Sequence, residues 1–128
     1  MGSVRVLTVD DHAAFRAAMR AVVDATAGFE TVGEASTGED GVAAAFRLLP
    51  DVVLMDVRLP GIDGYEAARR ISPQLPAIVI FLVSTADEAL HGGSATGCGA
   101  AAVVRKQDLR PSVLEELWAA HGTGSATT

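Results

Sequence analysis

Short apolar runs recur along the chain, and most of them are followed by a segment in which the apolar residues lie three or four positions apart. The runs are rich in β-branched residues and do not alternate with polar ones, as is typical of strands buried on both faces of a sheet. They predict strands over Val4–Val9, Glu30–Ala35, Val52–Met55, Ala77–Val83 and Ala101–Val104.

The segments between these runs have the spacing and the end signals of helices. Thr37 is suited to cap one of them, Pro50 closes it, and Pro111 suits the first helical position of the last one. The predicted helices cover His12–Thr26, Glu39–Leu49, Tyr65–Ile71, and Pro111 through Trp118. The alternation of strands and helices predicts an α/β fold, in which a doubly wound parallel sheet carries helices on both faces.

The segment that should belong to a fourth helix, His91–Ala100, is rich in glycine. It contains Gly92, Gly93, Gly97 and Gly99. Each glycine inside a helix costs about 0.5–1 kcal/mol relative to alanine. We therefore expect this helix to be short, frayed or mobile.

Composition narrows the class of protein. The 128 residues suffice for one domain, and 49% hydrophobic with 20% charged residues is typical of a globular chain. The net charge of −6 argues against nonspecific binding to nucleic acid or to an anionic membrane. Cys98 is the single cysteine, which excludes an intrachain disulfide and favours the cytoplasm. We expect one domain over residues 1–120 and a flexible tail over residues 121–128.

Charged and hydroxyl side chains follow several of the predicted strands. They are Asp10–Asp11, Asp56, Ser84–Thr85 and Arg105–Lys106. The carboxyl ends of parallel strands meet at one edge of a sheet, where ligands of doubly wound folds bind. Three carboxylates there repel one another by roughly 1–4 kcal/mol per pair at about 4 Å, so either their pKa values rise or a cation lies among them. Carboxylate oxygens with room for water molecules suit Mg²⁺.

Four features at these strand ends resemble the receiver domain of two-component response regulators. They are VDDH after the first strand, MDVRLPGIDG at the end of the third, a serine or threonine ending the fourth, and a lysine ending the fifth. The resemblance, which extends over about residues 4–120, implies a flavodoxin-like five-stranded parallel sheet in the order 2-1-3-4-5. It also implies a signalling switch that catalyses only its own phosphorylation and dephosphorylation, rather than an enzyme.

The resemblance implies a role for each acidic residue. Asp56 would accept a phosphoryl group from a phosphohistidine of a sensor histidine kinase. Asp10, Asp11, Asp56 and the backbone carbonyl of Arg58 would hold Mg²⁺, directly or through water. These roles agree with the chemistry, because a carboxylate can form a mixed anhydride and phosphoryl transfer needs mainly alignment and charge neutralisation.

The resemblance also assigns the hydroxyl and the ammonium group. Lys106 would pair with the phosphoryl oxygens, and Ser84 would donate a hydrogen bond to them. We choose Ser84 over the adjacent Thr85 because Ser84 lies 22 residues before Lys106, a separation similar to that in the family. The chain departs from the family at Val103, where Tyr or Phe is usual, and at Thr85, where Ala or Gly is usual. We hypothesise that phosphorylation acts instead by ordering the glycine-rich helix.

The stretches DDHAAFR and GEASTGEDGV, with Gln107 after the lysine, are similar to receivers that carry a helix-turn-helix DNA-binding output domain. The chain stops soon after its last helix, so it is either a stand-alone receiver or one without its output domain. The expected partners are a sensor histidine kinase and either that missing output domain or a downstream protein. We expect no direct binding to nucleic acid, no membrane association, and a monomer or a weak phosphorylation-linked dimer.

Three other functions stay open. An aspartyl-phosphate hydrolase would have a second aspartate two residues after the nucleophile, where this chain has Arg58. A flavin or nucleotide binder is disfavoured by the aspartates at the edge where an anion would bind. A degenerate receiver would be a protein-interaction module that acts without phosphorylation. Val103 supports that alternative, whereas the intact acidic residues count against it.

Overall fold

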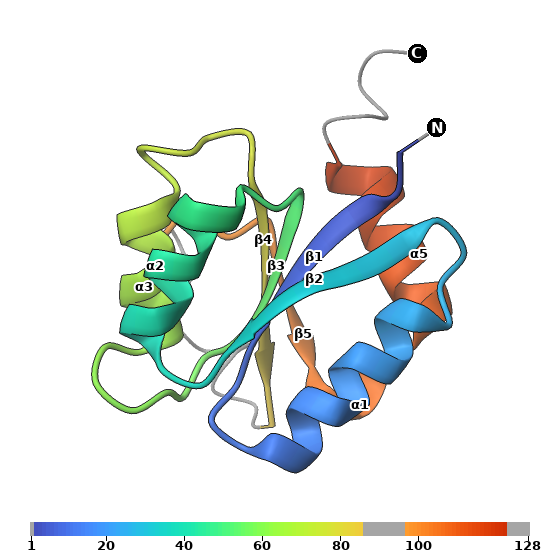
Figure 1. The fold of residues 1–128 in the computed structure, drawn as a ribbon, viewed down its shortest axis with the longest axis horizontal. Coiled ribbons are helices and arrows are strands. Elements are labelled where there is room, and N and C mark those ends of the chain that lie inside the picture. The colour runs from blue at the N-terminus through green and yellow to red at the C-terminus, as the bar shows by residue number, and fades with distance from the viewer. Residues whose placement is uncertain (1, 86–96, 123–128) are drawn as a thin grey trace.

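The computed structural model describes residues 2–85 and 97–122. Its strands form one parallel sheet in the order β2-β1-β3-β4-β5 (Figure 1). The helices and strands are β1 (Val4–Val9), α1 (Ala13–Asp24), β2 (Phe29–Ala35), α2 (Gly38–Leu48), β3 (Val52–Asp56), α3 (Gly64–Ile71), β4 (Val79–Ser84), β5 (Ala102–Arg105) and α5 (Pro111–His121). The predicted fold class and strand order are confirmed.

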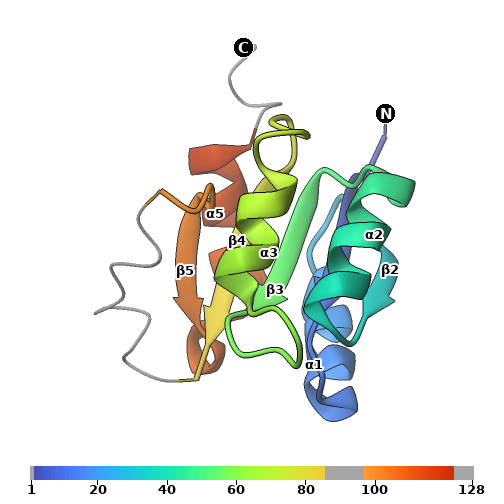
Figure 2. The same ribbon diagram turned by 90° about the vertical axis from the view of Figure 1, so that its left-hand side faces the viewer.

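Helices cover both faces of the sheet. Helices α2 and α3 lie against one face, and α1 and α5 lie against the other (Figure 1 and Figure 2). Along β3, successive side chains point to alternate faces of the sheet. Val53 and Met55 belong to the core cluster under α2 and α3, whereas Val52 and Leu54 belong to the cluster under α1 and α5. Because both faces of β3 are buried, its sequence is a continuous apolar run.

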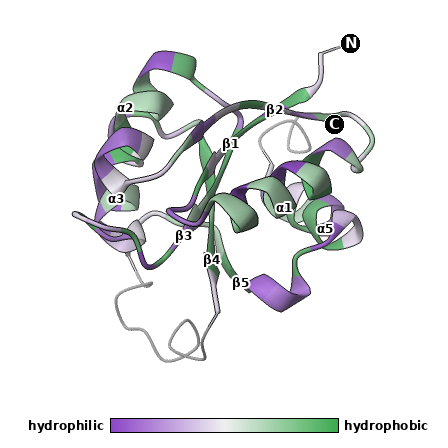
Figure 3. Ribbon diagram, turned by 60° about the horizontal axis from the view of Figure 1, so that its bottom comes forward, coloured by the Kyte–Doolittle hydropathy of each residue, from purple (hydrophilic) through white to green (hydrophobic). Residues whose placement is uncertain are grey.

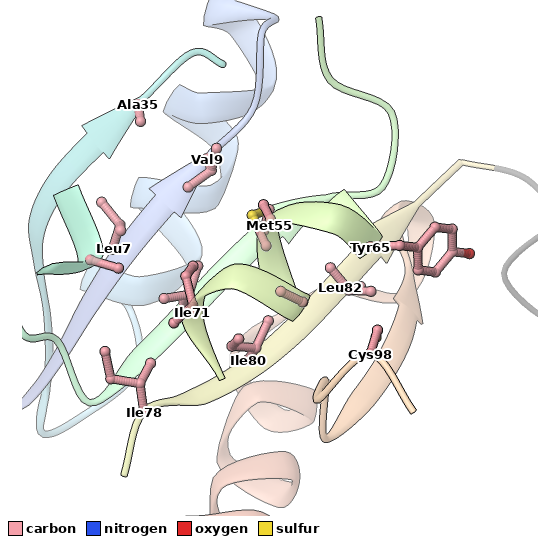
Figure 4. Packing of buried hydrophobic residues seen from close by; sticks show 14 of the residues in the cluster. Leu7, Val9, Ala35, Met55, Tyr65, Ile71, Ile78, Ile80, Leu82 and Cys98 are labelled. Atoms are coloured by element: carbon pink, nitrogen blue, oxygen red, sulfur yellow. The ribbon is translucent and has the colours of Figure 1, made fainter. Parts of the chain in front are cut away.

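The larger core cluster lies between the sheet and the helices α2 and α3. Figure 4 shows Leu7, Ile80 and Leu82 of the strands packed with Ile71 of α3. Cys98, which is 1% exposed, belongs to the same cluster. The residue hydropathy agrees with this division, because the strands are mostly hydrophobic, whereas the helices contain both hydrophilic and hydrophobic residues (Figure 3).

Some elements begin later than the sequence predicted. Helix α1 begins at Ala13 because His12 is its extended N-cap residue, and the His12 N–H donates a hydrogen bond to Asp10 Oδ1 (2.8 Å). Strand β4 begins at Val79 because the N–H of Ile78 still donates to a carbonyl of the preceding turn (3.1 Å). Caps and turns of this kind do not change the spacing of apolar residues, so this spacing does not predict where the helix or strand begins.

Two expectations concern residues outside the described part of the chain. The glycine-rich helix expected around His91–Ala100 falls largely on residues 86–96, which are not described. The described end of that segment is a turn, in which Gly97 and Gly99 have left-handed φ values of 80° and 99°. Helix α5 continues to His121, and residues 123–128 of the expected tail are not described.

The residue that ends α2 adopts a backbone conformation that glycine prefers. Leu49 has a left-handed φ of 49°, and 55% of it is exposed. A residue with a Cβ is strained there. We expect Leu49→Gly to raise the free energy of unfolding by about 0.5–1 kcal/mol, as measured by urea denaturation.

The matched control for this prediction is Phe46→Gly. Phe46 is also an exposed apolar residue of α2, at 41%, but it lies inside the helix. Glycine there should lower the free energy of unfolding by about 1 kcal/mol. If both substitutions destabilise the protein equally, the backbone of Leu49 is not strained.

Candidate functional site

The carboxyl ends of three strands bring charged side chains together. Asp10 directly follows β1, Asp56 is the last residue of β3, and Lys106 directly follows β5. In the parallel register Val9 of β1 pairs with Met55 of β3, which sets Asp10 beside Asp56. Both aspartates are buried, with 0% of Asp10 and 4% of Asp56 exposed. These predicted site residues therefore form one cluster.

Lys106 reaches both buried carboxylates from the far side of β4. Its Nζ lies 2.8 Å from Asp10 Oδ2 and 3.3 Å from Asp56 Oδ2. The lysine side chain is only 12% exposed. Lys106 is also the single lysine of the sequence. One ammonium group thus faces two buried carboxylates.

Asp11 and His12 extend the cluster to the protein surface. His12 Nδ1 lies 3.1 Å from Asp11 Oδ1 and 3.4 Å from Asp10 Oδ1, and the His12 side chain is 72% exposed. Potential ligand atoms of Asp10, Asp11, His12 and Asp56 all lie within 4.8 Å of one another. The sequence prediction did not include His12, although its place directly after two aspartates was an available signal.

The donor set of this cluster fits a small, hard divalent cation. Three carboxylates converge, and Asp11 adds a further negative charge to the pair that Lys106 already faces. Mg²⁺ prefers carboxylate oxygens and keeps several of its water molecules. The open pocket beside Asp11 and Asp56 leaves room for those waters. The residues present are therefore compatible with Mg²⁺.

Electrostatics at the cluster shift two pKa values. Burial and the neighbouring Asp10 carboxylate raise the pKa of Asp56 above its ordinary value of 3.8, although the Arg58 N–H and Lys106 act in the opposite direction. Burial lowers the pKa of Lys106, but the carboxylates of Asp10 and Asp56 outweigh burial and leave it raised. A second cation among the carboxylates would favour the ionised form of Asp56.

An open pocket of about 680 Å³ leads to the Asp56 carboxylate. The loop between β3 and α3 lines it, and Arg58 of this loop donates its N–H to Asp56 Oδ1 (3.2 Å). Thr85 and Lys106 line the pocket as well. A group that enters from solvent can therefore reach Asp56 and Lys106 together.

The loop that lines the pocket ends in close contact with the strand that carries Asp56. The Gly64 N–H donates to the Val57 carbonyl (2.8 Å). A Cβ at Gly64 would lie only 2.4 Å from the carbonyl oxygen of Asp56, so no larger residue fits there. Asp63 caps α3 by accepting a hydrogen bond from the Glu66 N–H (2.9 Å). Helix α3 therefore begins directly against the backbone of Asp56.

A profile of the response regulator receiver domain family matches residues 6–117. The chain belongs to this family. The response regulator GacA of Pseudomonas aeruginosa is 41% identical over 85 residues, which are 66% of this chain and 40% of GacA. The transcriptional regulatory protein LiaR of Bacillus subtilis is 39% identical over 90 residues, which are 69% of this chain and 43% of LiaR. The receiver domain thus spans less than half the length of these relatives.

A solved receiver domain has the same fold. The signal receiver domain of the putative response regulator NarL from Mycobacterium tuberculosis superposes with a TM-score of 0.81 at 30% identity, covering 91% of this chain and 98% of that one. The predicted membership in the response regulators of two-component systems is therefore confirmed. Within residues 2–85 and 97–122 of this receiver domain, no helix has both the length and the apolar character that a bilayer span requires.

The residues at the end of β4 differ in their exposure. Ser84 is the last residue of this strand, pairs with Arg105 of β5, and is 2% exposed. Thr85 is exposed and lines the pocket. Ser84 stays a prediction for the hydroxyl that contacts the phosphoryl oxygens. Val103, where the family usually has an aromatic residue, is partly buried and packs against the cluster under α2 and α3.

Proposed function

We propose that this chain is the phosphoacceptor receiver domain of a two-component response regulator. Asp56 takes a phosphoryl group from a phosphohistidine of a sensor histidine kinase. The observation that carries the proposal is the contact of Lys106 with both Asp10 and Asp56 beside an open pocket. Phosphoryl transfer needs mainly positioning and charge neutralisation, which such an arrangement can supply.

The metal and phosphoryl contacts follow from the same cluster. Mg²⁺ held by Asp10, Asp11, Asp56 and the backbone carbonyl of Arg58 would neutralise charge on the phosphoryl oxygens. Each of these residues lies in the acidic cluster or lines the pocket. Lys106 pairs with the phosphoryl oxygens from the other side, and the buried Ser84 hydroxyl at the end of β4 donates a hydrogen bond to them.

The transfer step uses one carboxylate oxygen of Asp56 as the nucleophile. It forms a bond to phosphorus while the bond between phosphorus and the kinase imidazole nitrogen breaks. The electron pair of the broken bond stays on that nitrogen, which takes up a proton, and Asp56 carries an acyl phosphate. Because burial and Asp10 raise the pKa of Asp56, the cations around it serve to keep the nucleophile ionised.

We propose that the output of the switch lies outside this receiver domain. The curated relatives GacA and LiaR are more than twice as long as the segments that match this chain. This length, together with the description of LiaR as a transcriptional regulatory protein, supports a DNA-binding output domain in the full protein, or a downstream partner if the receiver stands alone. We place the protein in the cytoplasm, as a monomer or a weak phosphorylation-linked dimer.

Incubation with Mg²⁺ and acetyl phosphate tests the proposal. Intact mass measurement should find one added phosphoryl group per chain, and none when a chelator replaces Mg²⁺. Beryllofluoride, which mimics a phosphoryl group, should raise the melting temperature only when Mg²⁺ is present. A degenerate receiver would gain no mass and show no such shift, and that result would overturn the proposal.

A further inference from the structure

We infer that Phe15 is a positioning residue for the site: its ring holds the Lys106 ammonium beside Asp56 through a cation–π contact. Phe15 lies in the first turn of α1, whereas Lys106 follows β5, so the contact joins elements far apart in the sequence. The contact between the two side chains is observed in the structure. Its effect on phosphorylation depends on the proposed function.

Among the described residues, three groups lie close to the Lys106 ammonium. Its Nζ lies 4.2 Å from the centroid of the Phe15 ring, which is within the range of a favourable cation–π contact. The same atom lies 2.8 Å from Asp10 Oδ2 and 3.3 Å from Asp56 Oδ2. With only 12% of the lysine side chain exposed, water screens these interactions weakly.

Packing alone does not require an aromatic residue at this place. Met19 and Val23 of the same helix are 0% exposed and belong to the cluster under α1 and α5, whereas Phe15 is partly buried at its edge. A leucine would fill much of the same space. What only an aromatic side chain supplies is the electron-rich face of a ring, which attracts the ammonium.

Beside the Lys106 ammonium, a neutral aromatic ring is more favourable for phosphorylation than a third anionic side chain would be. A metal ion at Asp10 and a phosphoryl group on Asp56 would draw on the same two carboxylates that now hold Lys106. The Phe15 ring ligates neither of them, so it can keep the ammonium in place when the carboxylates are engaged. It also adds no negative charge that would repel the phosphoryl group. Without it the flexible lysine stem could turn away.

Two substitutions separate the ring face from apolar bulk. Phe15→Leu keeps the apolar bulk and removes the aromatic ring, whereas Phe15→Tyr keeps the bulk and the ring. With Mg²⁺ and acetyl phosphate, the initial phosphorylation rate should fall about 3- to 10-fold in Phe15→Leu and stay within about twofold in Phe15→Tyr. Val22→Ala is the matched control, because Val22 packs from the same helix against the same cluster and should leave the rate unchanged.

A second measurement detects the contact without phosphorylation. Because Lys106 is the only lysine, selective isotope labelling of lysine gives one set of side-chain resonances in the NMR spectrum. The ring current of Phe15 should shift the ε-methylene resonances of Lys106 away from their usual position. This shift should be lost in Phe15→Leu and kept in Phe15→Tyr.

The outcomes distinguish this inference from the proposed function. Unshifted lysine resonances in the wild-type protein, or a wild-type rate in Phe15→Leu, would overturn the role of Phe15. Equal slowing in Phe15→Leu and Phe15→Tyr would also overturn it, because packing would then explain the effect. A wild-type protein that takes no phosphoryl group would overturn the proposed function instead, and the NMR comparison would then decide alone whether Phe15 positions Lys106.

Discussion

Replacing Asp56 with asparagine is expected to reduce phosphoryl incorporation from acetyl phosphate by at least about 100-fold, because the carboxylate nucleophile is lost. The same substitution should raise the free energy of unfolding at neutral pH, with a chelator present, by about 1 kcal/mol. It removes one negative charge from a buried cluster in which Asp10 and Asp56 share the Lys106 ammonium. Intact mass and urea denaturation measure the two effects.

The gain in stability should depend on pH. Burial and Asp10 raise the pKa of Asp56 in the folded protein, so the folded state holds the proton more tightly than the unfolded chain does. Ionisation of Asp56 therefore costs stability as the pH rises from about 3.8 through the folded pKa. The excess in free energy of unfolding of Asp56→Asn over the wild type should be absent below this pH range and reach its full value above it. A variant less stable than the wild type at neutral pH would contradict this origin of the pKa shift.

Lys106→Met should have the largest effect on stability. With a chelator present, the free energy of unfolding should fall by about 2–4 kcal/mol, because methionine leaves two buried carboxylates without their ammonium. Burial lowers the pKa of Lys106, but Asp10 and Asp56 leave it raised above 10.5. The lysine therefore contributes stability throughout the range below pH 10.5 and loses it as the pH rises through the folded pKa. Urea denaturation measures the loss.

Mg²⁺ should reverse much of the loss in Lys106→Met. The ion would interact with the same carboxylates as the ammonium, so Mg²⁺ should bind the variant more tightly and stabilise it more than the wild type. A Mg²⁺ titration of the melting temperature measures this difference. Arg69→Met is the control, because Arg69 forms an exposed pair with Glu66 (3.3 Å) whose loss should cost at most about 1 kcal/mol. A Lys106→Met variant with wild-type stability would refute this account of the cluster.

The strands could be predicted because burial on both faces leaves a continuous apolar run. Val4–Val9 matches β1 from end to end. The starts of α1 and β4 could not be predicted, because they depend on single hydrogen bonds. Asp10 accepts from the N–H of His12 and so delays the start of α1, and a turn delays the start of β4 to Val79.

The acidic cluster could be predicted because each of its residues follows or ends a strand. Parallel strands end at one edge, so Asp10, Asp56 and Lys106 had to meet there once the strands were recognised. The place of Phe15 could not be predicted, because its contact with Lys106 depends on how α1 crosses the sheet.

The pair at the end of β4 was equally difficult to assign from the sequence. Which of two neighbouring hydroxyl residues faces the pocket depends on the residue at which the strand stops. The strand continues through Ser84, which is buried, and Thr85 therefore lies on the pocket wall. Separation along the chain identifies the family position but carries no information on the direction of a side chain.

The close backbone contact that glycine allows at position 64 limits how the domain can move. Because the first turn of α3 rests on the peptide of Asp56 with no spacer between them, helix and strand end form one rigid body. A displacement of the acceptor carboxylate would carry this helix with it, and the pocket cannot widen between the two.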